Sequence, residues 1–248
     1  MRSAIGIAIT LTLVACSDGS TPPLSVIVLT AENQWIHPSN PVAAEALEVT
    51  GAERGWTVQV TADPRTFDSA TLAQTDVVVF SVTSGPILDD AARAELETFW
   101  TGGGGYVGVH SASSTEGSWP FYRELLPVTF LTHPTVQEGP LTVESSHPIV
   151  SGVPDPWLHT DEFYTFNERP EELDVDLLLA LDESAAGPDY PDNVRVGYHP
   201  LAFSHEKLGG RVFYTALGHT PESYSEPVFM QMLAQGIEWA GAERHARR

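Results

Sequence analysis

Short apolar runs alternate with amphipathic, helix-forming segments through the first half of the chain, and this alternation constrains the fold more than any other feature. Residues 24–29 and 76–82 are almost continuously apolar, which is typical of strands buried on both faces. Residues 88–100 carry apolar side chains at helical spacing, and residues 106–109 begin a further strand. Strands that alternate with helices in this way predict an α/β fold, a parallel sheet flanked by helices.

The second half of the chain is less regular, but it shows no composition break of the kind that separates domains. Candidate strands lie at residues 141–144, 162–166, 175–181, 201–204 and 211–217. A final amphipathic helix is expected from about residue 227 to 240. We therefore predict one α/β domain over residues 24–241, followed by a solvated tail over residues 242–248.

The chain begins with the pattern of an exported lipoprotein. Residues 1–15 hold one cation and then an apolar run of secretory-signal length, too short to span the ~30 Å hydrocarbon core of a membrane. The run ends just before Cys16 in Leu-Val-Ala, which resembles the bacterial lipobox. We expect a lipid anchor on Cys16, a tether over residues 16–23 and a location facing the periplasm or the cell surface. An ordinary signal peptide or a buried first strand is the alternative.

Charge and cysteine content exclude several classes of function. The 33 acidic and 12 basic residues give a net charge of −21, and because binding a phosphate backbone needs clustered cations, no nucleic-acid partner is expected. Cys16 is the only cysteine, so the rest of the chain has no thiol nucleophile and no cysteine zinc site. A GxGxxG pattern at residues 103–108 follows a predicted helix and opens a strand, the reverse of a dinucleotide site.

Histidines placed before prolines and after strands are the strongest chemical signal. His37, His133 and His199 each precede a proline, which biases the backbone toward extended conformations at strand ends and loop mouths. His110 and His219 follow predicted strands, at the carboxyl edge where open α/β sheets bind ligands. We take His37, His110 and His219 as candidate catalytic residues, with His133 and His199 lining the site. Ordinary His-Pro turns are the alternative.

Two adjacent carboxylates, Asp161 and Glu162, complete the candidate catalytic set. Neighbours in a strand point to opposite faces, so one of them can face the cleft, while His159 shares the side of Asp161. Together with several imidazoles, such a carboxylate would be a general base, or it would complete a histidine-rich site for zinc or a similar divalent ion. Whether a metal is bound stays open, and a solvated acidic strand edge is the alternative.

Aromatic residues near these histidines suggest a platform for a sugar ring. Trp119, next to a proline in a loop, and Tyr164, which follows the paired carboxylates, are the candidates for substrate binding. Core packing is the alternative, since it explains most aromatic side chains.

The segments that carry these residues, taken in order, resemble the ThuA-like family, named for trehalose utilisation. The most specific of them are the runs at residues 102–113 and 210–219, which contain His110 and His219. The resemblance implies a flavodoxin-like, class I glutamine amidotransferase-like fold and an association with disaccharide and keto-sugar catabolism. True amidotransferases carry a cysteine nucleophile after the fourth strand, where this chain has His110, so glutamine hydrolysis through a thiol is excluded.

Three hypotheses follow. The leading one is a lipid-anchored enzyme of hydrolase, lyase or isomerase type that acts on a sugar or keto-glycoside. The second is a non-catalytic carbohydrate-binding lipoprotein that uses aromatic stacking. The third is a structural surface module, which predicts that the histidines scatter over the fold, whereas the first requires them to meet in one hollow.

Overall fold

A nine-stranded sheet forms the centre of the molecule in the computed structural model, which describes residues 22–186 and 190–247. Its order is β2-β1-β3-β4-β11-β10-β9-β6-β7. The first five of these strands run parallel: β2 (Thr57–Thr61), β1 (Ser25–Leu29), β3 (Val77–Ser81), β4 (Gly105–Val109) and β11 (Val212–Thr215). The other four pair antiparallel: β10 (His199–His205), β9 (Asp176–Leu181), β6 (Gln137–Val143) and β7 (Trp157–Asp161). A separate pair joins β5 (Phe130–Thr132) to β8 (Thr165–Phe166).

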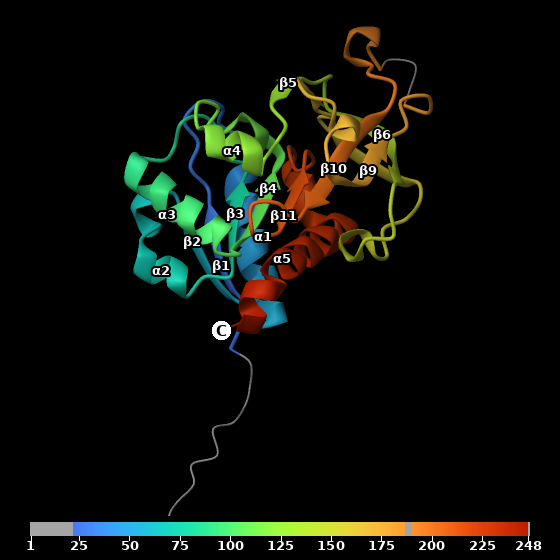
Figure 1. The fold of residues 1–248 in the computed structure, drawn as a ribbon. Coiled ribbons are helices and arrows are strands. Elements are labelled where there is room, and N and C mark those ends of the chain that lie inside the picture. Colours follow the sequence, from blue (N-terminus) through green and yellow to red (C-terminus); the bar gives the residue numbers. More distant parts are fainter. Residues whose placement is uncertain (1–21, 187–189, 248) are drawn as a thin grey trace, which may run out of the picture.

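Helices cover both faces of the parallel half of the sheet (Figure 1). They are α1 (Ser39–Arg54), α2 (Ser69–Ala73), α3 (Asp90–Thr101), α4 (Pro120–Leu125) and α5 (Pro227–Arg247). Figure 1 shows α2, α3 and α4 on one side of the parallel strands and α1 and α5 on the other. The side chain of Asp89 accepts the Ala92 N–H at the start of α3, which supplies the cap that a helix N-terminus needs.

Two packing layers hold these helices to the sheet. On the α3 side, Trp100 meets Tyr106 of β4 with ring centroids 5.5 Å apart, and both side chains are fully buried. On the α5 side, a Cβ added to Gly105 would lie 2.6 Å from the carbonyl oxygen of Ala240. The absence of a side chain at Gly105 therefore lets α5 cross β4 closely, and this fixes the strand whose carboxyl end carries His110.

The α/β fold with parallel strands flanked by helices is confirmed, but the sheet is mixed rather than parallel throughout. Helices connect the strands of the first half, whereas short loops and 3₁₀ turns connect those of the second, which pair antiparallel. An antiparallel neighbour needs no crossover helix, so the loss of helical segments after residue 126 is the sequence sign of the change. The strand expected at residues 162–166 is divided between β7, which ends at Asp161, and β8, which begins at Thr165.

The C-terminal residues differ from the predicted solvated tail. Helix α5 continues to Arg247, and its last turns contact the sheet edge. Arg244 donates from Nε to the carbonyl oxygen of Thr75 at 2.8 Å and from Nη2 to that of Leu72 at 2.9 Å. Residues 242–247 therefore belong to the packed helix, because these hydrogen bonds and helix continuity outweigh the fraying that their polar composition suggests.

The predicted signal peptide, Cys16 and the tether as far as residue 21 lie outside the described residues. Within the residues that are described, no helix has the length and apolar character needed to cross a membrane.

Candidate functional site

The three strands β1, β4 and β11 bring three histidines together at the carboxyl edge of the sheet. His37 lies in the loop after β1, His110 follows β4 directly, and His219 follows β11. Their ring centroids are 5.2 Å (His37–His110), 5.6 Å (His37–His219) and 5.1 Å (His110–His219) apart. Residues that are far apart in the sequence thus form one compact cluster, which we call the histidine cluster.

His110 is the most constrained member of the histidine cluster. It is fully buried and has a φ of +52°, a left-handed conformation that costs about 1–3 kcal/mol when a residue other than glycine is held in it. Its Nδ1–H donates to the carbonyl oxygen of Ala216 at 2.8 Å, so its Nε2 carries the lone pair and accepts the hydroxyl of Tyr164 at 2.7 Å. Burial lowers the pKa of His110 to about 4, although the nearby Asp161 carboxylate opposes the shift. His110 is therefore a neutral imidazole at pH 7.

Glu162 joins the histidine cluster from the loop after β7. One carboxylate oxygen lies 2.9 Å from His219 Nδ1 and 3.9 Å from His110 Nε2, and the other lies 3.3 Å from His133 Nδ1. Burial lowers the pKa of His219, but its hydrogen bond to Glu162 outweighs burial, so that the pKa is raised overall. Four predicted residues, His110, His219, His133 and Glu162, thus meet within contact distance.

Asp161 acts from beneath this site rather than inside it. Its buried carboxylate accepts the backbone N–H groups of Gly218 at 2.7 Å and His219 at 3.1 Å. Its third partner is the Nε2 of His159 at 3.1 Å, and the Nδ1 of the same ring lies 2.7 Å from Glu226. Burial lowers the pKa of His159, but the hydrogen bonds to the two carboxylates raise it to about 9. A protonated His159 between two carboxylates therefore fixes the turn that carries His219.

Glu32 and Glu226 support the site, and sequence reasoning missed both. Glu32 accepts the backbone N–H of His37 at 2.8 Å and the ring Nδ1–H at 2.9 Å. Glu226 holds His159 and also accepts the indole N–H of Trp157 at 2.5 Å. Neither residue belongs to a motif. A nearby signal existed only for Glu32, which lies five positions before His37 in the same loop.

An aromatic-walled pocket of about 500 Å³ lies beside the cluster. Trp35 and Phe130 line it together with polar residues that include Gln34 and Ser113. The Phe130 ring packs 4.4 Å from Tyr164, whose own ring lies 4.3 Å from His110. The pocket is therefore continuous, through Tyr164, with the histidine cluster.

Trp119, the predicted sugar platform, lies elsewhere. Its side chain is only 8% exposed and packs among the rings of Trp100, Phe121 and Tyr122. Trp35, which is 52% exposed, and Phe130 wall the pocket instead. The alternative of core packing describes Trp119 because the helix that follows it, α4, folds its ring onto α3.

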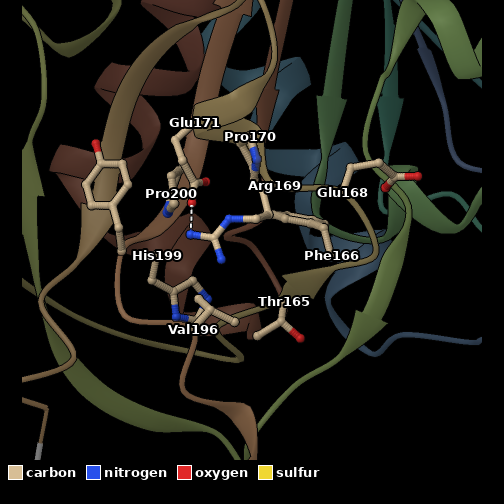
Figure 2. A pocket seen from close by; sticks show the side chains of 10 residues that line it. Thr165, Phe166, Glu168, Arg169, Pro170, Glu171, Val196, His199 and Pro200 are labelled. Atoms are coloured by element: carbon tan, nitrogen blue, oxygen red, sulfur yellow. Dashed lines mark hydrogen bonds and ion pairs between the residues drawn. The ribbon is translucent and has the colours of Figure 1, made fainter.

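His199, which was predicted to line the site, stands behind Tyr164. Its Nδ1 lies 2.8 Å from Glu183, and its Nε2 lies 2.8 Å from the carbonyl oxygen of Tyr164. It borders a different pocket, drawn in Figure 2, of about 50 Å³, which has room for only a few water molecules. The contacts of His199 hold the backbone of Tyr164 and leave neither of its ring nitrogens free.

A family model described as trehalose utilisation, ThuA, matches residues 25–240. The chain belongs to the ThuA family. No curated protein matches this ThuA chain significantly. The family is associated with trehalose utilisation.

Solved structures show the fold of this ThuA protein to be class I glutamine amidotransferase-like. A ThuA-like protein from Bacteroides uniformis matches with a TM-score of 0.73 and 19% identity over 91% of this chain and 94% of its own. A second, from Parabacteroides merdae, matches with a TM-score of 0.69 and 21% identity over 89% and 91%. A GMP synthase protein from Thermoplasma acidophilum matches with a TM-score of 0.53 and 16% identity over 91% and 98%. At these identities the likenesses establish architecture alone.

Proposed function

We propose that this protein is an enzyme of carbohydrate catabolism that acts on a sugar or keto-glycoside at the histidine cluster. The observation that carries the proposal is the contact between two unlike surfaces, a polar cluster rich in imidazole and carboxylate and a pocket walled by Trp35 and Phe130. Aromatic faces stack on sugar rings, and polar groups beside them orient the hydroxyls. The family's association with trehalose utilisation supports the same substrate class.

The chemistry that fits this cluster is proton transfer beside a carbonyl or glycosidic carbon. Glu162 reaches the space between His219 and His133 and is the base. The Tyr164 hydroxyl is the donor, because burial and neighbouring Tyr214 and Glu162 raise its pKa and keep it protonated. A base and an acid that flank one substrate carbon are sufficient for an elimination or an isomerisation on a keto-sugar. No thiol takes part, since the sequence has no cysteine beyond Cys16.

The test is to incubate the full chain with trehalose and with a keto-glycoside prepared from it, and to follow free monosaccharide by chromatography. We expect one of the two to be consumed, and Glu162→Gln to slow consumption by about 10³-fold. Trp35→Ala should raise KM by about tenfold with a small change in kcat, because it removes only stacking. Tyr198→Ala, an exposed aromatic residue on the antiparallel half, is the matched control and should change neither constant.

Two outcomes would overturn the proposal. If both sugars bind with Trp35-dependent affinity but no product forms, the protein is the non-catalytic carbohydrate-binding lipoprotein. If neither sugar binds, the carbohydrate assignment itself falls.

We also propose that the protein is exported and anchored by lipid on Cys16, on the strength of the lipobox-like sequence that precedes this cysteine. Expression in a bacterial host followed by membrane fractionation tests this. The unaltered chain should sediment with membranes, whereas Cys16→Ser should be processed without lipid or retained as the precursor. Identical fractionation and mass for the two chains would refute the anchor.

A further inference from the structure

The ring nitrogens of His37, His110 and His219 point to a ligand smaller than a sugar. One nitrogen from each ring lies within 4.8 Å of the corresponding nitrogen of both others. His37 is 8% exposed and His110 is fully buried, while the side chain of His219 is 26% exposed. The three therefore form an inward-facing set with access from one side.

Two of the rings are held from behind in the manner of metal ligands. His37 donates its Nδ1–H to Glu32, and His110 donates its Nδ1–H to the carbonyl oxygen of Ala216. Histidines that bind metals usually donate their other ring N–H to a carboxylate or a backbone carbonyl, which fixes the tautomer and the ring orientation. In both residues this leaves the Nε2 lone pair for a ligand in the centre.

Distances inside the cluster suit a tetrahedral ion. His110 Nε2 and His219 Nδ1 are 3.2 Å apart, and two nitrogens bound at ~2.0 Å to one tetrahedral zinc ion are roughly 3.3 Å apart. The nearest oxygen of Glu162 lies 2.9 Å from His219 Nδ1 and 3.9 Å from His110 Nε2. A carboxylate oxygen therefore stands where a fourth ligand would complete the set.

We propose that His37, His110 and His219 bind one divalent first-row metal ion of the zinc class, with Glu162 as the fourth donor. Three neutral imidazoles and one carboxylate are a donor set for zinc and its first-row neighbours, whereas calcium and magnesium prefer oxygen alone. The ion replaces the hydrogen bonds that now join the rings and the Tyr164 hydroxyl. This inference does not depend on the identity of the sugar.

The test measures metal rather than turnover. The full chain is stripped with a chelator and titrated with Zn²⁺ against a chromophoric competitor, and separately loaded with Co²⁺, whose visible absorption reports tetrahedral coordination. We expect one equivalent of metal per chain. His219→Ala and His37→Ala should each weaken binding by at least about 100-fold, and Glu32→Gln by roughly 10-fold, because it alters only the support of one ligand.

His147→Asn is the matched control, since His147 lies away from the cluster and caps a 3₁₀ turn through Nδ1, a role that Asn also fills. It should bind metal as the unaltered chain does. The proposal is overturned if the unaltered chain takes up no stoichiometric Zn²⁺ or Co²⁺, or if the His37 and His219 variants bind as tightly as the control. Circular dichroism on each variant identifies those that fail to fold, and the Co²⁺ spectrum of the unaltered chain is decisive in that case.

The outcomes separate this inference from the proposed function. Metal uptake without any sugar consumption would leave the metal site standing and remove the enzymatic proposal. Sugar consumption that is unchanged in a chain shown to be free of metal would do the reverse.

Discussion

Two groups of buried histidines in this molecule differ in how many ring nitrogens the protein itself occupies. In His159 and His199, on the antiparallel strands β7 and β10, both nitrogens are bonded to carboxylates or to a carbonyl oxygen. In His37 and His110, at the ends of the parallel half, the fold holds Nδ1 and directs Nε2 toward a shared centre. The first group is saturated, and the second keeps one nitrogen available for a ligand.

The difference teaches that burial alone does not mark a functional histidine. All four rings are less than 9% exposed. A saturated ring ties two elements together, as His159 ties β7 to the start of α5 through Glu226. A ring with one nitrogen left is held in place and remains reactive, and this is the combination that a catalytic or metal-binding residue needs.

The largest effect should come from His110. His110→Asn should lower kcat/KM by about 10⁴-fold, roughly 5 kcal/mol of transition-state free energy, because it removes the central imidazole. Asn tolerates a positive φ better than most residues, so the backbone after β4 should keep its conformation. Kinetic assays beside thermal unfolding would check this. Unimpaired turnover, or unfolding at the growth temperature, would break the distinction between the two groups.

His159 should behave in the opposite way. His159→Gln removes the positive charge between Asp161 and Glu226, both of which then lose an ionic partner, so we expect the free energy of unfolding to fall by about 4 kcal/mol. Turnover at low temperature should stay within about tenfold of the unaltered chain, since the ring makes no contact with the pocket that we identify. Urea unfolding and kinetics on the same samples measure both. A stable variant with no turnover would place His159 in the wrong group.

The pH dependence of stability gives a finer test of the saturated group. The pKa of His159 is raised to about 9 in the folded protein, against about 6.5 in an unfolded chain. Its contribution is therefore fully present below pH 6.5 and is lost as the pH rises through 9, a loss of about 3 kcal/mol. Urea unfolding at pH 6.5 and pH 9.5 should show this loss in the unaltered chain but not in His159→Gln. Parallel pH profiles for the two proteins would show that His159 is neutral when folded.

The sequence predicted much of this arrangement, and the part that it missed follows a physical rule. Strand ends could be found from apolar runs, and parallel strands end at one edge, so the meeting of His110 with His219 followed from topology. The side of His159 followed from the two-residue period of a strand. Glu32 and Glu226 carried no pattern because a single supporting carboxylate is defined only by tertiary contact. Trp119 and Trp35 are indistinguishable by type, and only packing decides which one meets solvent.

His133 is the intermediate case and carries the smallest expected effect. Its Nδ1 lies 2.7 Å from its neighbour's carbonyl oxygen and 3.3 Å from Glu162, so only Nε2 is left, as in the reactive group. Unlike those rings, its side chain is 36% exposed, and water can therefore replace it. His133→Ala should raise KM by about five- to tenfold, roughly 1 kcal/mol, with the unfolding free energy changed by less than about 0.5 kcal/mol. A loss of turnover as large as that of His110→Asn would mean that a free nitrogen is sufficient for function. An effect confined to KM would mean that the ring must also be buried and held.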